Sequence, residues 1–423
     1  MELWIPITHW TTPPFYGTVT APATCMLQKD NIAMRTVSAR YRQALSFLLV
    51  LILLGFCSPP GAQADGGAPN LAYVSGTSSG ISVIDVGQAK VAKTIPVAGD
   101  PHTILLSQDG RLLYVTQPTI GQVSIVAART GQIICSVHLP GEPTLLAIDQ
   151  ATTTLYAAGT GAARVTALNS MNCAVQHVFN TESPIYGLAV TLPGSGDGSS
   201  NQLWAAGQDS LMIFDDRSGQ TLGKIPLAEG PQYLSIPPDG MVYVATRQGN
   251  VDVVDFKTRE VHQLLTGGTF GPMDYDALTG EVYVPDEQHN LLDVLSPVDS
   301  GTPTIPKEPN RVIRTGVPPE AVAITSDGLL GFVALQGGKV AMFDLLNRHL
   351  VYTIDVGGMP HFVITGLYPP ATDPTPLANK SAVRGDKSAP TPGIVTNMLY
   401  VLAVVFFMVF LITGSLLLLR RRK

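Results

Sequence analysis

The chain has 423 residues, of which 45% are hydrophobic and 14% charged, and its formal net charge is −6. Such a chain is long and apolar enough to bury a large core. Residues 1–64 and 420–423, assigned below to a leader and a tail, hold eight basic and two acidic residues, which leaves 18 basic and 30 acidic residues between them. No stripe of Lys or Arg stands out in this acidic region. It therefore argues against nucleic acid as a partner and favours cations, a basic partner or plain solubility outside the cell.

Residues 1–33 carry no periodic pattern. We interpret them as either a disordered extension or the product of an upstream start codon chosen in error. The second interpretation is favoured because Met34 begins a signal-peptide pattern. Its parts are a basic region, a 13-residue apolar region too short to span a bilayer of about 30 Å, and a small-residue cleavage motif: Arg35, Arg40 and Arg42; Ala44–Phe56; Ala62-Gln63-Ala64. Residues 1–64 are thus predicted to be an extension plus signal peptide, cleaved after Ala64.

The stretch from Pro101 to Leu139 is the repeating unit of the chain. It holds four short apolar runs, each β-branched or aliphatic and too short for a helix: Thr103–Ser107, Leu112–Thr116, Val123–Ala127 and Ile133–Leu139. Turn signals such as Asp109-Gly110 and Thr130-Gly131 separate the runs, which predicts four strands. The resulting antiparallel sheet has two apolar faces and needs further copies of itself on either side.

Copies of this unit follow one another along the chain. A proline opens the innermost strand of every copy, at spacings of 41 to 47 residues: Pro101, Pro143, Pro184, Pro231, Pro272, Pro319 and Pro360. An aromatic residue marks the second strand: Tyr73, Tyr114, Tyr156, Trp204, Tyr243, Tyr283 and Phe332. An acid often ends the third strand: Asp85, Asp215, Asp255, Asp293 and Asp344. Periods of about 40–45 residues with four strands each predict an all-β, seven-bladed propeller over residues 65–367.

The two ends of the pattern predict how the ring closes. The chain enters at Leu71–Val74, a second strand without a first, and leaves at His361–Thr365, a first strand without a second. We expect both to pair in one composite blade, because closure of the ring removes exposed sheet edges.

Three segments carry the resemblance of this chain to a known family: LAYVSGTSSGISVIDVGQAKVAKTIPV, LLYVTQPTIGQVSIVAARTGQIICSV and MVYVATRQGNVDVVDFKTREVHQLL. They resemble the YVTN-type repeats of seven-bladed β-propellers over roughly residues 70–370. The resemblance implies an extracytoplasmic propeller in a family better known for binding and surface roles than for chemistry.

The C-terminal part predicts a membrane anchor. Residues 368–394 form a Pro-rich linker, and Val395–Leu419 is an uncharged apolar run of 25 residues, long enough to span a bilayer with some tilt. The basic residues 420–423 follow at once, so this end is predicted to be a cytoplasmic tail. We therefore predict a single-pass protein of the cell membrane with its propeller outside the cytoplasm. A cell-wall sorting tail is the disfavoured alternative, because residues 389–393 do not form the sorting motif.

Two cysteines, Cys135 and Cys173, remain after the predicted cleavage. An exported pair favours a disulfide. However, both cysteines are predicted at or near the outermost strands of neighbouring blades, where the strands should diverge beyond the Cα separation of about 7 Å that a disulfide allows. We therefore expect no bridge.

Candidate site residues follow from the symmetry of the ring. The residue after each opening proline should lie at the mouth of the central channel, which gathers His102, Thr144, Ile185, Gln232, Met273, Glu320 and His361. Glu320, His361 and His102 belong to consecutive blades and could bind a small polar ligand or, as two imidazoles and a carboxylate, a divalent metal. The favoured interpretation is more ordinary, with Pro-His simply beginning the strand and the ring hydrogen-bonded to a neighbouring loop.

Catalytic motifs are nearly absent. Residues 76–80 match G-x-S-x-G, but they are predicted in a hairpin and not in the strand-to-helix turn that activates a serine. We therefore predict a non-enzymatic binding or scaffold module with a protein or small-molecule partner and no cofactor. The alternative is a lactonase-like hydrolase that uses a polar or metal site at the channel mouth. The insertions at Leu192–Gln202 and Pro297–Asn310 are predicted to share the opposite face, where a partner could dock.

Overall fold

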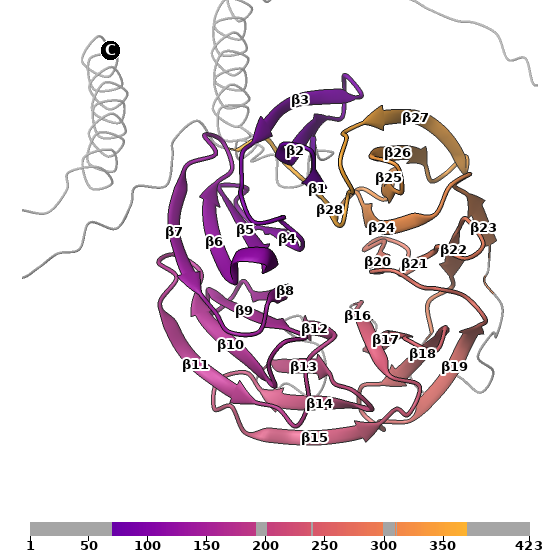
Figure 1. Ribbon diagram of the computed structural model, residues 1–423. Coiled ribbons are helices and arrows are strands. Elements are labelled where there is room, and N and C mark those ends of the chain that lie inside the picture. The colour runs from indigo at the N-terminus through magenta and orange to yellow at the C-terminus, as the bar shows by residue number, and fades with distance from the viewer. Residues whose placement is uncertain (1–69, 192–200, 238–239, 299–308, 310, 370–423) are drawn as a thin grey trace, which may run out of the picture. The chain divides into compact units, whose positions relative to one another are not determined.

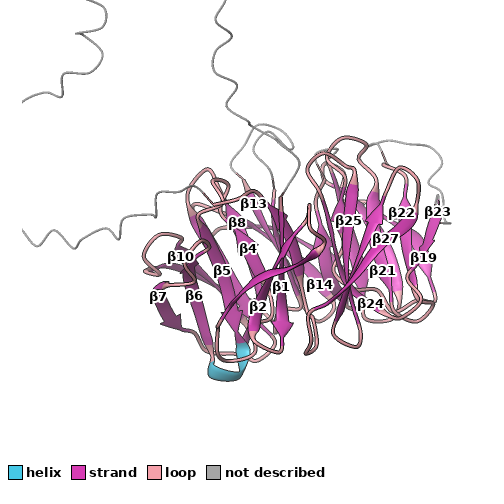
Figure 2. Ribbon diagram, turned by 90° about the horizontal axis from the view of Figure 1, so that it is seen from above, coloured by secondary structure: helices cyan, strands magenta, loops and turns pink. Residues whose placement is uncertain are grey.

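The computed structural model describes residues 70–191, 201–237, 240–298, 309 and 311–369. Within these residues the strands form seven four-stranded antiparallel sheets. The sheets stand side by side around a ring, each with one strand at the centre and one at the rim (Figure 1). Seen from the side, the strands run between the two faces of the ring, and turns line both faces (Figure 2). The predicted all-β, seven-bladed propeller is confirmed.

The first half of the ring comprises the composite blade and blades 2 to 4. From the centre outwards, the composite blade consists of β28 (Val363–Gly366), β1 (Leu71–Thr77), β2 (Gly80–Asp85) and β3 (Lys90–Ile95). Blade 2 consists of β4 (Ile104–Leu106), β5 (Leu112–Gln117), β6 (Gln122–Ala127) and β7 (Ile133–His138), with the 3-10 turn η1 (Pro118–Ile120) after β5. Blade 3 consists of β8 (Pro143–Asp149), β9 (Thr154–Gly159), β10 (Arg164–Asn169) and β11 (Val175–Asn180). Blade 4 consists of β12 (Gly187–Val190), β13 (Gln202–Ala206), β14 (Ser210–Asp215) and β15 (Thr221–Pro226).

Blades 5 to 7 complete the ring. Blade 5 consists of β16 (Pro231–Ser235), β17 (Met241–Thr246), β18 (Asn250–Asp255) and β19 (Val261–Thr266). Blade 6 consists of β20 (Asp274–Tyr275), β21 (Val282–Asp286), β22 (Leu291–Leu295) and β23 (Arg311–Arg314). Blade 7 consists of β24 (Pro319–Ile324), β25 (Leu330–Leu335), β26 (Lys339–Asp344) and β27 (His349–Asp355).

The composite blade joins the two ends of the propeller, as predicted. β28 pairs antiparallel with β1, with Leu71 opposite Gly366 and Val74 opposite Val363. The innermost strand begins two residues later than the sequence suggested, at Val363. His361 still joins the ladder, because its N–H donates to the carbonyl of Ser75 over 3.2 Å.

The hydrophobic core of the ring is divided among the gaps between blades. Each of the seven buried clusters combines side chains of two neighbouring blades. The cluster between blade 7 and the composite blade, for example, packs Val363 and Val74 against Phe332. The predicted second-strand aromatics, from Tyr73 to Phe332, are all buried in these clusters. Each blade therefore depends on its neighbours for its core.

The second-strand tyrosines also link blades through hydrogen bonds. The Tyr156 hydroxyl of blade 3 bonds to the Asp216 carbonyl of blade 4 over 3.4 Å. The Tyr243 hydroxyl of blade 5 accepts from the backbone N–H of Val298, which follows β22 of blade 6, over 3.2 Å. A buried hydroxyl without a partner would cost free energy, so these bonds favour one spacing between the blades.

The assignment of Asp293 to the end of a third strand is wrong. β22 ends at Leu295, opposite Val282, and Asp293 lies in mid-strand opposite Val284. Where a third strand does end in an acid, the acid accepts backbone N–H groups of the following turn, as Asp85 does from Gln88 and Asp344 from Asn347. The register gives the reason. Tyr73 lies opposite Val83, two residues before Asp85, whereas Tyr283 lies opposite Val294, so the terminal position in blade 6 is held by Ser296. Burial and the carboxylate of Asp286 instead raise the pKa of Asp293 to about 6.

The prediction against a disulfide is also wrong. Cys135 and Cys173 are bonded, and their Cα atoms are 5.9 Å apart. Cys135 lies on the outer strand β7, but Cys173 lies in the turn before β11, with a positive φ of 59°. This turn bends Cys173 into the core between blades 2 and 3, where it is buried beside β7. The divergence of the outer strands therefore does not separate the two sulfur atoms.

Several predictions concern residues that the structure does not describe. The signal peptide, the linker from residue 370, the apolar segment Val395–Leu419 and most of both insertions lie outside the described residues. Among the residues that are described, no helix is long and apolar enough to cross a membrane.

Closure of the ring can be tested at Val363. Its side chain is 1% exposed, so Val363→Ala should lower the free energy of unfolding by about 2 kcal/mol through lost packing between blade 7 and the composite blade. Leu346→Ala is the matched control, because Leu346 is 73% exposed and its loss should change stability by less than about 0.5 kcal/mol. Thermal or denaturant unfolding of the purified chain measures both. Equal stability of the two variants would contradict the closure described here.

Candidate functional site

The channel mouth is built from the residues that follow the opening prolines. Of the seven positions predicted to line it, Ile185 and Met273 are buried in inter-blade clusters and contribute no polar group. The other five are partly exposed: His102, Thr144, Gln232, Glu320 and His361. The apolar side chains turn toward the core, whereas the polar ones stay in contact with solvent.

His102 and His361 stack on each other. Their ring centroids are 4.9 Å apart and their planes differ by 16°. The Ser75 hydroxyl of the composite blade donates to the His102 carbonyl and so fixes the backbone of one histidine beside the other. The predicted neighbourhood of His102 and His361 is therefore present in the structure.

Thr144 contacts this pair from blade 3. Its carbonyl accepts a hydrogen bond from the Thr103 hydroxyl over 2.5 Å and another from the His102 ring. Thr144 lies on strand β8, so the His102 ring bonds to a strand of blade 3 and not to the neighbouring loop that was expected.

The two imidazoles differ in their electrostatic surroundings. Burial, with His361 as the second cause, lowers the pKa of His102 from 6.5 to about 4, so His102 is neutral at pH 7. His361 Nε2 lies 3.5 Å from Asp100 Oδ1, a distance compatible with an ion pair. The alignment is not that of a hydrogen bond, and this nitrogen has no hydrogen-bond partner among the described residues.

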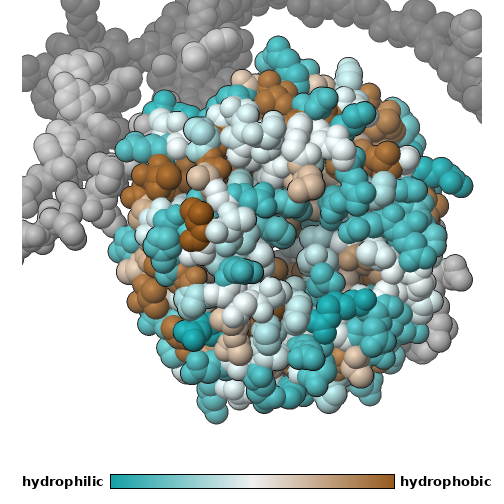
Figure 3. Space-filling view, in the orientation of Figure 1, coloured by the Kyte–Doolittle hydropathy of each residue, from teal (hydrophilic) through white to brown (hydrophobic). Residues whose placement is uncertain are grey.

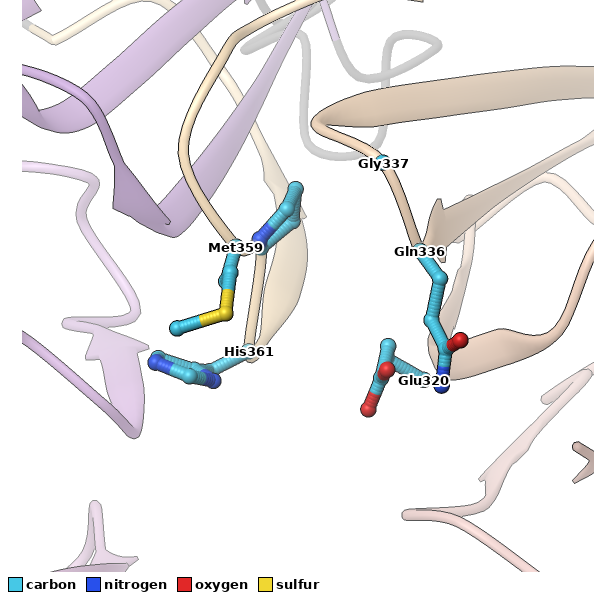
Figure 4. Close-up of a pocket in the computed structure, with 6 residues that line it drawn as sticks. Glu320, Gln336, Gly337, Met359 and His361 are labelled. Carbon is cyan, nitrogen blue, oxygen red and sulfur yellow. The ribbon is translucent and has the colours of Figure 1, made fainter.

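A pocket of about 320 Å³ opens between blade 7 and the composite blade. Its lining consists of Glu320, Gln336, Gly337, Met359, Pro360 and His361. Figure 4 shows the side chains of Met359 and His361 on one wall and those of Glu320 and Gln336 on the other. Figure 3 shows a hollow at the centre of the ring that is bordered mainly by hydrophilic and neutral residues.

Backbone hydrogen bonds hold both walls of the pocket. Met359 N–H donates to the Gly76 carbonyl over 2.8 Å, and Gln336 N–H donates to the Pro318 carbonyl over 3.0 Å. Gly76 has a φ of +72°, and a Cβ there would collide with the Met359 carbonyl oxygen. The close approach of the two segments therefore requires glycine at position 76.

The next sector of the channel, on blades 5 and 6, is acidic. Burial and the nearby carboxylate of Glu320 raise the pKa of Glu287 to about 7. Burial and the charge of Glu287 also raise the pKa of Tyr233, whose hydroxyl bonds to the side chain of Gln232. Gln232 thus belongs to this sector and not to the histidine pair.

The predicted site therefore divides into two parts. The structure brings His102, His361 and Thr144 together, and it places Glu320 across the pocket from His361. In the described part of the chain, no three His, Cys, Asp or Glu side chains are grouped so that they could hold a metal ion. Glu320 is therefore not placed beside the two imidazoles as a third ligand, and the residues present do not fit the predicted metal site.

Sequence reasoning missed Gln336, Met359, Asp100 and Glu287. These residues lie in turns near the ends of strands, and no marker of the repeat includes them. Glutamine does recur in the turn after the second strand, at Gln208, Gln248, Gln288 and Gln336, and this repetition was the available signal.

Comparisons with known proteins support the fold. No family model matches the chain, so the resemblance to YVTN-type repeats stays a prediction. Antigen Lp49 of Leptospira interrogans is 43% identical over 68 residues, which span 15% of this chain and 15% of that protein. A match this short covers less than two blades and does not show a family.

Solved structures match over most of the ring. A functionally unknown protein from Desulfotomaculum acetoxidans matches 70% of this chain and 99% of its own, with a TM-score of 0.58 and 11% identity. A putative 6-phosphogluconolactonase from Bacteroides uniformis matches 70% and 99%, with a TM-score of 0.57 and 16% identity. Apo AztD from Citrobacter koseri matches 71% and 99%, with a TM-score of 0.53 and 13% identity. At these identities the likeness shows the fold alone, which is that of a β-propeller.

The buried imidazole can be tested by its effect on acid stability. His102 takes up a proton near pH 6.5 in the unfolded chain but only near pH 4 in the folded one. Its contribution to stability is therefore fully present above pH 6.5 and is lost as the pH falls toward 4. We expect the melting temperature of His102→Asn to fall less between pH 7 and pH 4.5 than that of the unchanged chain.

The control for this measurement is His138→Asn, which changes an exposed histidine on the outer strand β7. Its melting temperature should follow that of the unchanged chain across the same pH range. Parallel pH profiles for His102→Asn and the unchanged chain would show that His102 is not buried in its neutral form.

Proposed function

We propose that this chain is a binding module, displayed outside the cytoplasm on a single membrane anchor, that takes a small polar ligand at the channel mouth without catalysing a reaction. The observation that carries the proposal is the pocket between blade 7 and the composite blade. The pocket has a volume of about 320 Å³. The carboxylate of Glu320 and the amide of Gln336 lie on one wall, and the imidazole of His361 and the thioether of Met359 lie on the other. A concave site of this size, with few and convergent polar groups, is typical of small-ligand binding.

The ring supports the proposal through its rigidity. The pocket walls belong to two blades that share a packed cluster, and backbone hydrogen bonds hold each wall within its own blade. A preformed site loses little conformational entropy when it binds, so few contacts suffice for affinity.

The disulfide supports a location outside the cytoplasm. Disulfides persist in oxidising compartments and are rare in the reducing cytosol. Together with the predicted signal peptide and the apolar segment 395–419, the Cys135–Cys173 bridge favours export of the propeller. In this proposal the membrane binds the apolar segment 395–419 and not the propeller.

A second candidate function is hydrolysis of the lactonase-like kind. The feature that favours it is the histidine pair with Glu320 across the pocket, since imidazole and carboxylate groups serve in general acid–base catalysis. The shared fold with a putative 6-phosphogluconolactonase adds only a fold-level analogy.

Binding at the mouth can be tested by blocking the pocket. Gln336→Trp places an indole at an exposed position of the pocket wall and should abolish binding of the small polar compounds that raise the melting temperature of the unchanged chain. The matched control is Gln288→Trp, which changes an exposed glutamine in the corresponding turn of blade 6. This variant should still bind the same compounds. Compounds that still bind to Gln336→Trp would place the ligand site elsewhere. Turnover of simple lactones by the unchanged chain would instead favour the hydrolase.

Export can be tested on the mature protein itself. Mass spectrometry of the chain isolated from membranes should show an N-terminus at Asp65 and two cysteines that react with an alkylating agent only after reduction. A chain that retains residues 1–64, or whose cysteines react in freshly lysed cells without a reductant, would contradict export.

A further inference from the structure

The walls of the channel-mouth pocket differ in chemical character. One wall offers the Glu320 carboxylate, which only accepts hydrogen bonds when ionised, and the Gln336 amide, which has an acceptor oxygen and a donor NH2 group. The other wall offers the Met359 side chain and the His361 ring. Met359 is 70% exposed although it is hydrophobic, so an apolar group seated against it would be shielded from water.

The charges near the pocket are predominantly negative. Glu320 lines the pocket, and Asp100 lies beside His361. Glu287 lies near Glu320 and, with a pKa of about 7, is partly ionised at pH 7. His102 is neutral at pH 7 and adds no positive charge. Residues 65–419 hold 30 acidic and 18 basic residues, and this excess of negative charge adds to the negative electrostatic potential at the pocket.

Two cations on the same side of the ring lie outside the pocket lining. Arg247 lies over the Tyr186 ring, 4.0 Å from its centroid, and donates to the Gln208 carbonyl on blade 4. Lys339 begins β26 directly opposite Asp355 of β27. Neither residue is part of the pocket lining.

We propose that the ligand of this pocket is a small organic ammonium ion whose N–H groups bond to Glu320 and Gln336 and whose carbon chain lies against Met359. This inference rests on the proposed function and adds the class of ligand to it. An ammonium group supplies up to three donors to a wall that offers acceptors, and a charged hydrogen bond to a carboxylate is among the stronger ones.

An organic cation fits better than a metal ion. The residues that the structure describes contain no group of three His, Cys, Asp or Glu suited to a metal. Met359, on the wall opposite the oxygen ligands of Glu320 and Gln336, would also add nothing to the binding of a hard cation, because hard cations prefer oxygen ligands. The thioether of Met359 and the imidazole ring of His361 can instead pack against the methylene groups of an alkylammonium ion.

The test compares three probes of one carbon skeleton on the purified full chain: n-butylammonium, n-butanol and n-butyrate. Calorimetric titration should show binding of n-butylammonium and at least about tenfold weaker binding of the other two, since each lacks the cationic donor. Glu320→Gln keeps the shape of the side chain and removes its charge, and it should raise the Kd for n-butylammonium about tenfold or more. Higher salt should weaken the same binding.

The matched control is Glu260→Gln, which makes the same chemical change at a side chain that is 71% exposed between β18 and β19. It should leave the Kd for n-butylammonium unchanged. Equal binding of n-butanol, or an unchanged Kd in Glu320→Gln, would overturn the ammonium assignment. So would the absence of n-butylammonium binding to folded protein.

These outcomes are distinct from failure of the proposed function itself. If other small compounds bind and Gln336→Trp blocks them while n-butylammonium does not bind, the pocket is a ligand site and only the class of ligand is wrong. If Gln336→Trp blocks no compound that binds to the unchanged chain, the pocket is not the ligand site and both proposals fail.

Discussion

The pairing of β28 with β1 is the constraint on which the rest of the ring depends. Each inter-blade cluster needs two blades, so an open ring would leave two blade faces without a partner and a sheet edge exposed. The four residue pairs between β1 and β28 remove both defects at once. They also place the first and last described segments of the propeller within a single sheet.

The same pairing builds the candidate site. His361 lies just before β28, and its N–H bonds to Ser75 on β1, whose hydroxyl in turn holds the carbonyl of His102 on blade 2. The histidine pair thus spans a blade boundary that exists only when the ring is closed. The pocket lies at the next boundary, between the composite blade and blade 7. Ligand binding at this place would therefore be linked to the integrity of the closed ring.

Sequence periodicity was sufficient to predict the ring, because the opening prolines and the buried aromatics recur once in every blade. It also brought His102 and His361 together through symmetry alone. It failed where one blade departs from the repeat. Blade 6 has Ser296 at the position that an acid takes in other blades, so Asp293 was assigned to the wrong place, and Cys173 turns inward because its own φ is positive. Gln336 and Met359 lie in turns, where side-chain direction follows from tertiary contacts and not from a period of two.

The position of β28 has a mechanical consequence. The described chain ends shortly after this strand, where the Tyr368 hydroxyl bonds to Asp85 Oδ2 over 2.6 Å. A pull on the C-terminal side of Tyr368 is first borne by this bond and then by the β1–β28 ladder. Tension applied to the chain beyond Tyr368 would thus act on β28, the strand that closes the ring, before it acts on any other blade.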